Sequence, residues 1–142
     1  MIRAVSLAFA LVLLLPACAP TADSFSIHRF GVSADNAFPP LDRTVTDAAV
    51  ASHLYEEVRA LRPQATEGTV FCGLDFGVRH ELSFFAHGDR ILHGVMQMGC
   101  HVFDLGAGDV RTFDDRFEAD LLSALGLYTR GNDLWPTPIP RP

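Results

Sequence analysis

The sequence predicts an α+β domain, in which an antiparallel sheet of about four to five strands has two helices packed on one face and one disulfide. Three observations lead to this prediction. Apolar residues recur at helical spacing in two separate segments. The stretch between those segments is rich in β-branched and aromatic residues and is cut by glycines, as antiparallel strands are. Two cysteines, Cys72 and Cys100, lie at either side of the clearest part of that stretch.

The N-terminal half of the domain is expected to form two strands and a helix. Residues 25–30 alternate in a period-two pattern, and residues 43–45 form a second, short strand. Thr46 or Asp47 can cap the helix that follows, and Arg62-Pro63 ends it. The apolar stripe of this helix is Val50, Leu54, Val58 and Leu61.

A hairpin is the clearest expected feature of the sheet. Its strands are residues 78–86 and 91–98, and its turn is Gly88-Asp89. A glycine at the first central position supplies the positive φ that a type II′ turn needs. This register places Phe84 opposite His93 and His80 opposite Gln97.

The C-terminal third is expected to complete the sheet and add the second helix. After Gly99, residues 100–105 form a strand and residues 110–112 form a short return strand. Thr112 and Asp115 have the spacing of a capping box. The helix after them has the apolar stripe Phe113, Phe117, Leu121 and Leu125 and ends at Gly126.

The N-terminus has the organisation of an export signal. Arg3 precedes an uninterrupted apolar run over residues 4–15. This run is shorter than the roughly 20 apolar residues that a membrane-spanning helix needs. Leu15-Pro16-Ala17-Cys18 ends the segment, and it resembles the lipobox of bacterial lipoprotein precursors, from which only Pro16 departs.

That resemblance implies cleavage before Cys18 and attachment of lipid to its thiol. The acyl chains would hold the protein on a membrane of the bacterial cell envelope, facing outside the cytoplasm. Cleavage after the A-x-A sequence 17–19 and an uncleaved leader are the alternatives.

The domain organisation follows from these limits. Residues 1–17 are the signal peptide, 18–24 a tether, 25–130 a single α+β domain and 131–142 a proline-rich tail. The tail is expected to be disordered, with a polyproline II recognition segment as the alternative.

Charge and cysteine content restrict the partners and the compartment. The chain has 11 basic and 17 acidic residues, so its formal net charge is −6, which argues against binding nucleic acid. Lipidation of Cys18 leaves an even pair, Cys72 and Cys100, in a compartment that permits disulfides. We therefore predict that these two are bonded; a zinc site or a catalytic thiol is the alternative.

Three further segments resemble a group of small bacterial secreted proteins and lipoproteins to which no function is assigned. The segments are residues 43–47 (RTVTD), residues 72–78 (CGLDFGV) and Gly99-Cys100. The resemblance implies the same disulfide and the same domain limits.

Few residues suggest a catalytic or metal-binding role. The sequence has no G-x-S-x-G, H-E-x-x-H, P-loop or dinucleotide motif, so an enzyme is not favoured and no cofactor is expected. His80 and His93 on the hairpin, with His101 just beyond, are candidate metal ligands. The alternative is that each histidine is structural. Glu56-Glu57 and Asp114-Asp115 are adjacent on helices and are interpreted as solvated.

The function expected first is a membrane-anchored envelope lipoprotein whose domain binds a protein or other envelope component without catalysis. The alternative is a metal-binding protein or metal-dependent enzyme that uses the hairpin histidines. A third hypothesis is a protease-inhibitor-like domain that presents a disulfide-braced loop near Gly99-Cys100.

Overall fold

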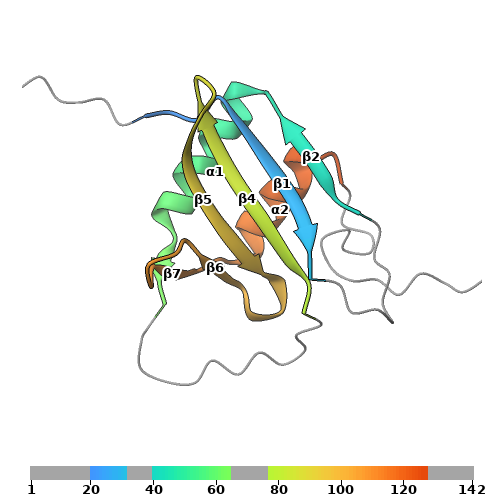
Figure 1. The fold of residues 1–142 in the computed structure, drawn as a ribbon, viewed down its shortest axis with the longest axis vertical. Helices are drawn as coiled ribbons and strands as arrows, with labels where there is room; N and C mark the ends of the chain where they lie inside the picture. The colour runs from blue at the N-terminus through green and yellow to red at the C-terminus, as the bar shows by residue number, and fades with distance from the viewer. Residues whose placement is uncertain (1–19, 32–39, 65–76, 128–142) are drawn as a thin grey trace, which may run out of the picture.

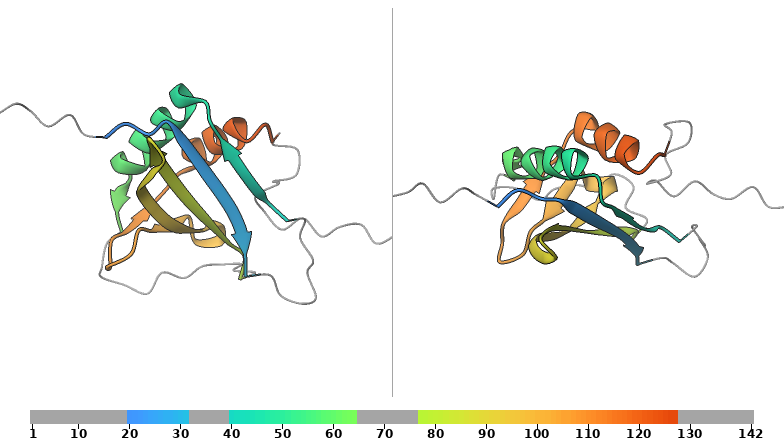
Figure 2. Two further views of the ribbon diagram at one scale, coloured as in Figure 1. Left: turned by 45° about the horizontal axis from the view of Figure 1, so that its top comes forward. Right: turned by 90° about the horizontal axis from the view of Figure 1, so that it is seen from above.

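One antiparallel sheet with two helices on the same face makes up the fold (Figure 1). The structure is a computed structural model, and it describes residues 20–31, 40–64 and 77–127. The sheet has seven strands in the order β2-β1-β4-β5-β6-β7-β3. Seen along the sheet, both helices lie above it (Figure 2). The α+β class and the two helices are confirmed, whereas the prediction of four to five strands is wrong.

The additional strands are short. Four of the seven, β2, β3, β6 and β7, have between two and four residues, too few to show a period-two pattern. The strands are β1 (Ser24–Phe30), β2 (Asp42–Val45), β3 (Arg62–Pro63), β4 (Arg79–Ala86), β5 (Asp89–Gln97), β6 (Val102–Asp104) and β7 (Val110–Thr112). The helices are α1 (Ala48–Ala60) and α2 (Asp115–Ala124), and a 3-10 turn, η1 (Met98–Cys100), follows β5.

The hairpin of β4 and β5 forms as expected, but its register differs. Ala86 pairs with Asp89, so the turn is His87-Gly88 and not Gly88-Asp89. Both turn residues have positive φ, 54° and 87°, as a type I′ turn requires. A register shift after Phe84 adds one residue to β5, which pairs Ser83 with His93. Because side chains alternate, this slip moves His93 to the face opposite the core.

The two faces of the sheet differ in polarity. Alternate residues of β1, β4, β5 and β6 point toward the helices and are buried, and α1 and α2 bury their own apolar stripes against them. The core therefore lies between the sheet and the helix pair. Its largest members are Phe25, Ile27, Leu82, Phe84, Met96 and Phe103 from the sheet and Leu54, Val58, Phe117 and Leu121 from the helices.

An aspartate caps the N-terminus of each helix. The Asp47 carboxylate accepts hydrogen bonds from the amides of Ala49 and Val50 at 3.0 and 3.2 Å, which confirms it as a cap of α1. Asp114 does the same for α2 by accepting from the Phe117 amide at 3.0 Å, so Asp114 and not Thr112 is the cap.

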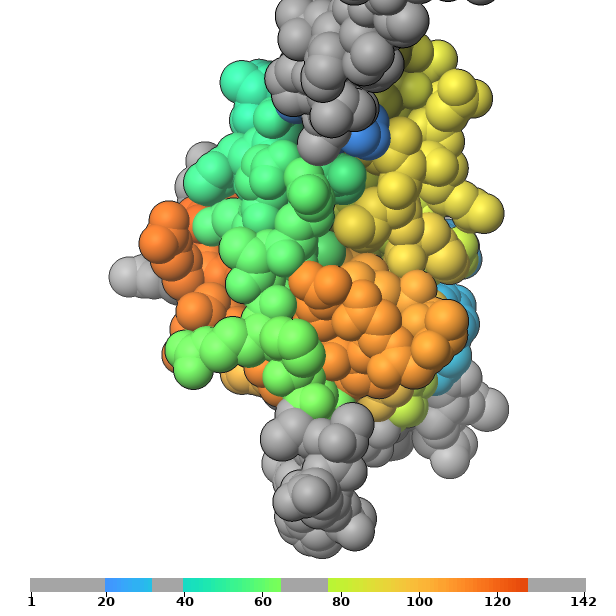
Figure 3. Space-filling model, turned by 90° about the vertical axis from the view of Figure 1, so that its left-hand side faces the viewer, coloured from blue at the N-terminus to red at the C-terminus, as the bar shows by residue number. Residues whose placement is uncertain are grey.

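Two arginines connect the helices to the edges of the sheet. Arg43 of β2 donates to the carbonyl of Leu125, just after α2. Arg111 of β7 donates to the carbonyl of Arg59 at 2.8 Å, near the end of α1. In the space-filling view the end of α1 and β3 (green) lie against the β6–β7 region (orange), with α2 beside them (Figure 3). The edge position of β3 suits Pro63, which has no N–H to donate.

The folded region begins slightly before the expected boundary. Ala22 is 2 % exposed and the Asp23 amide donates to the Phe85 carbonyl at 2.9 Å, so these residues of the expected tether pack on the domain. The signal peptide, Cys18, Cys72 and the tail lie outside the described residues, and the disulfide stays a prediction. None of the described helices has the length and apolar character needed to cross a membrane.

Candidate functional site

The three histidines predicted as metal ligands do not come together. His80 lies on the core face of β4 and is fully buried. His93 pairs with Ser83 and lies on the opposite face of the sheet. His101 follows η1 in a left-handed conformation and stacks on Phe113, with ring centroids 5.4 Å apart. His80 and His93 therefore do not lie where they could bind the same metal ion.

His80 is a structural residue. Its Nε2 accepts a hydrogen bond from Nε of Arg29 at 3.1 Å inside the core. Burial lowers the pKa of His80 from its usual 6.5 to about 3, and the positive charge of Arg29 acts in the same direction. The ring is therefore neutral at pH 7. Since Nε2 accepts, Nδ1 carries the proton, and it has no partner among the described residues.

His93 has polar neighbours but not a catalytic arrangement. The Ser83 hydroxyl lies 3.1 Å from Nδ1 of His93, and a carboxylate oxygen of Glu81 lies 3.5 Å from the same nitrogen. A serine–histidine–acid triad needs the hydroxyl and the acid on different ring nitrogens. These three residues therefore do not form a nucleophilic site.

The Gly99-Cys100 segment is not an extended loop. It belongs to η1, which begins at Met98, and the Met98 side chain is 3 % exposed. Cys100 is half-buried. A loop presented to a protease would be exposed and extended, so the described geometry does not favour the inhibitor hypothesis.

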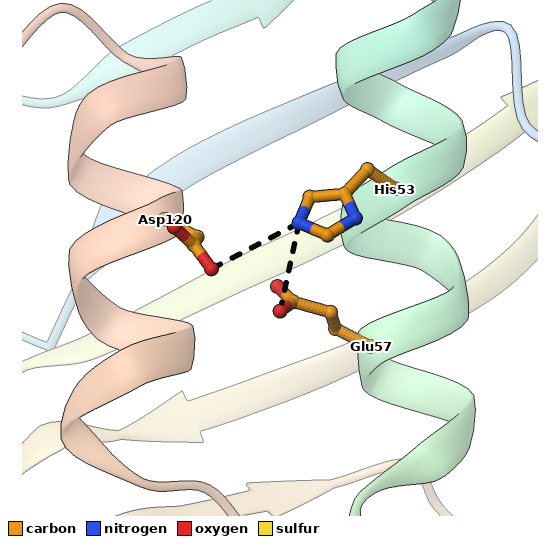
Figure 4. A group of neighbouring side chains, drawn as sticks. All are labelled: His53, Glu57 and Asp120. Atoms are coloured by element: carbon orange, nitrogen blue, oxygen red, sulfur yellow. Dashed lines mark ion pairs between the residues drawn. The ribbon is translucent and has the colours of Figure 1, made fainter.

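The structure brings together a different group, which we name the helix-pair cluster: His53 and Glu57 of α1 with Asp120 and Arg116 of α2. Figure 4 shows three of its members, His53, Glu57 and Asp120. Nε2 of His53 lies 3.6 Å from Oε1 of Glu57 and 3.9 Å from Oδ2 of Asp120. Nε of Arg116 lies 3.7 Å from the same two oxygens. Two carboxylates thus face each other between the helices.

Glu57 is the most buried member of the helix-pair cluster. Its side chain is 17 % exposed, compared with 58 % for its neighbour Glu56, so the solvated interpretation holds for Glu56 and is wrong for Glu57. Its Oε2 is buried and accepts no hydrogen bond from the part of the chain that the structure describes. Burial raises the pKa of Glu57, and the charge of Asp120 adds to the effect, against the opposing influence of His53 and Arg116.

The sequence contained one signal for this cluster. His53 and Glu57 are four residues apart on a predicted helix, so they had to lie on the same side of it. Arg116 and Asp120 repeat this spacing on the second helix. Nothing in the sequence indicated that the two pairs face each other.

Hollows lie along the helix pair on both sides of the cluster, and together we name them the helix-pair groove. One, of about 490 Å³, is between the start of α1, the end of α2 and β2. The other, of about 260 Å³, is between the end of α1 and the start of α2. Both include His53 in their lining. The larger is lined by Val45, Asp47, Ala49, Val50, His53, Leu54, Asp120, Ser123 and Ala124.

Among the residues that the structure describes, the lining of the larger hollow combines apolar walls with carboxylates and contains no lysine or arginine. Such a surface favours a ligand with both apolar and cationic parts. No family model, no curated protein and no solved structure matches this chain.

Acid should destabilise the domain through His80. Below pH 6.5 the unfolded chain binds a proton at this residue and the folded chain does not, until pH approaches about 3. The free energy of unfolding should therefore fall as pH decreases through this window, by up to about 1.4 kcal/mol per pH unit from this group.

Urea unfolding of the wild type and of His80→Gln between pH 7.5 and 4.5 measures this contribution. The amide oxygen of glutamine still accepts from Arg29 but does not titrate, so the variant should show a flatter dependence on pH. His28→Gln, at a side chain that is 54 % exposed, is the control and should keep the wild-type slope. Equal slopes in all three proteins would show that His80 is not the acid-sensitive group.

Proposed function

We propose that this protein is a lipid-anchored lipoprotein of the bacterial envelope whose domain binds a partner without catalysing a reaction. The observation that supports binding is the helix-pair groove, which combines apolar walls with carboxylates. The residues that support anchoring are Leu15 to Cys18, through their resemblance to a lipobox. A disulfide between Cys72 and Cys100 belongs to the same proposal.

The tether to the lipid would be short. Ala22 is packed in the core, so only three residues separate the folded domain from Cys18. At about 3.6 Å per step, the four steps along the chain from Cys18 to Ala22 reach at most about 14 Å. The start of β1 lies beside the tip of the hairpin, where the His87 amide donates to the Asp23 carboxylate at 2.6 Å. In this proposal the hairpin tip therefore lies near the membrane surface.

The occupant that we propose for the groove is a segment of an envelope protein that carries basic and apolar side chains. The walls supplied by Val45, Val50 and Leu54 can cover an apolar side chain. Asp47 and Asp120 lie at the margins and attract a cation, and the chain as a whole is acidic. The volume of the larger hollow is in the usual range for a ligand pocket.

A binding role is favoured over nucleophilic catalysis. Such catalysis needs a hydroxyl or thiol on one ring nitrogen of a histidine and an orienting acid on the other. The contacts of Ser83 and Glu81 with a single nitrogen of His93 do not supply this.

Replacement of Cys18 should release the protein from the membrane. Without the thiol no diacylglyceryl group can be attached, and the domain has no other acyl anchor in this proposal. Fractionation of cells that express the full chain should find wild type in the membrane fraction, and Cys18→Ser in the soluble fraction or retained with its leader. Cys72→Ser is the matched control and should stay with the membranes. Membrane association of Cys18→Ser with no leader attached would contradict lipid anchoring.

Binding in the groove should be sensitive to a cation introduced into its wall. The probe is a short peptide of arginine and tryptophan residues, titrated into the ¹⁵N-labelled mature protein in mild detergent. We expect it to cause saturable changes in the amide chemical shifts of α1, α2 and β2. Val50→Arg should weaken this binding by about ten-fold or more, because it places a like charge in the groove.

The matched control is Val95→Arg, which adds the same charge on the opposite face of the sheet and should bind as wild type does. Shifts that do not saturate, or that map to the uncovered sheet face, would contradict the proposed binding surface.

A further inference from the structure

We propose that the helix-pair cluster binds a divalent transition-metal cation, with Nε2 of His53 and the carboxylates of Glu57 and Asp120 as its protein ligands. The inference goes beyond the proposed function, because it adds a metal ion to the groove in which we propose that a partner segment binds. Arg116, the fourth member of the cluster, has a separate role in it.

The ligand set suits this class of ion. Imidazole nitrogen and carboxylate oxygen together bind Zn²⁺ and its first-row neighbours, whereas Mg²⁺ and Ca²⁺ prefer oxygen alone. The three donors come from two helices that pack on the same sheet, and the spacing of four residues aims His53 and Glu57 to the same side of α1. Packing of the core therefore positions the ligands before any ion binds.

The distances are close to those of a metal site. The three ligand atoms lie within 4.8 Å of one another, and His53 is 3.6 and 3.9 Å from the two carboxylate oxygens. Ligands at about 2.1 Å from a tetrahedral Zn²⁺ are about 3.4 Å apart. The donors must move closer together to bind the ion, and their partly exposed side chains have the freedom to do so.

The charges within the cluster also favour a bound cation. Oε2 of Glu57 is buried and has no hydrogen-bond partner among the described residues, whereas buried polar atoms almost always have one or bind an ion. The two carboxylates repel each other, which contributes to the raised pKa of Glu57. Arg116 compensates only one of the two negative charges. A divalent cation would neutralise the two carboxylates together.

Arg116 lies where it would compete with a metal ion for the carboxylates of Glu57 and Asp120. Its Nε is 3.7 Å from both carboxylates, beyond hydrogen-bond distance, and its side chain is 76 % exposed. Such loose surface contacts contribute little, so the arginine can turn toward solvent when an ion binds. In this assignment Arg116 lies beside the two carboxylates when no ion is bound and turns away from them when an ion binds.

The groove provides access and an open coordination position. Hollows of about 490 and 260 Å³ lie on either side of His53, so water can reach the ion. Three protein ligands with water in the fourth position are typical of Zn²⁺ sites that remain open to a further ligand. A donor group of the envelope partner can occupy the same position.

Calorimetric titration of ZnCl₂ into the mature protein in mild detergent, after dialysis against EDTA, tests the site. We expect one equivalent of Zn²⁺ per chain. His53→Ala and Asp120→Asn should each weaken binding by about ten-fold or more, as loss of groups at a metal site does. Circular dichroism should show that both variants are folded, since His53 and Asp120 are partly exposed. Glu56→Gln is the matched control on α1 and should bind as wild type does.

The variant Arg116→Ala distinguishes a metal site from a network of ion pairs. Removal of the competitor should make Zn²⁺ binding about two- to five-fold tighter, the equivalent of the modest energy of surface pairs. Unchanged or weaker binding in this variant would overturn the assignment. So would the absence of stoichiometric binding, or binding that is retained in His53→Ala and lost in His101→Ala, where Asp115 and Glu118 form a second group of potential ligands.

The two proposals can fail independently. If the peptide still binds in the groove and Zn²⁺ does not bind, only the metal assignment is wrong. If Zn²⁺ binds as described and the peptide does not, the occupant proposed for the groove is wrong and the metal assignment stands.

Discussion

Both helices must bury their apolar stripes on the same face of one sheet, and the other features of the structure depend on this constraint. The strands supply large buried side chains such as Phe84 and Phe103, and the helices cover them with Leu54 and Leu121. Two helices placed side by side on a sheet also face each other along their flanks. The sheet cannot cover that flank, so it is where polar side chains from distant parts of the sequence meet. His53 and Asp120 meet there.

Local features of the fold could be predicted from the sequence because they depend on neighbouring residues. The cap at Asp47 and the stop before Pro63 bound α1 as expected. The hairpin was also predicted, but its register was not, because the turn lies one residue earlier than expected and one additional residue in β5 changes the pairings beyond it. The edge strand β3 has only two residues, and its pairing with β7 depends on how α1 packs. No local pattern encodes that arrangement.

The candidate site was harder to predict than the fold. His80 shares its period-two position with Leu82 and Phe84, so the alternation along β4 already placed it on the apolar face. A histidine in such a place is more often buried and neutral than a ligand, and the contact with Arg29 agrees with that. The helix-pair cluster instead needs two helices to be adjacent, and His53 and Asp120 are far apart in the sequence. The sequence shows only the spacing of four residues within each helix, between His53 and Glu57 and between Arg116 and Asp120.

The central claim is that α1 and α2 keep a charged, partly buried groove for a cationic ligand at a cost to the stability of the free protein. Thermal unfolding of Glu57→Gln at pH 7, without added metal, tests it most directly. A raised pKa means that the folded protein disfavours the charged carboxylate, so the neutral amide should raise the midpoint of unfolding, while Glu56→Gln should leave it unchanged. A lower midpoint for Glu57→Gln would show that this carboxylate is a stabilising ion-pair partner, and would contradict the account.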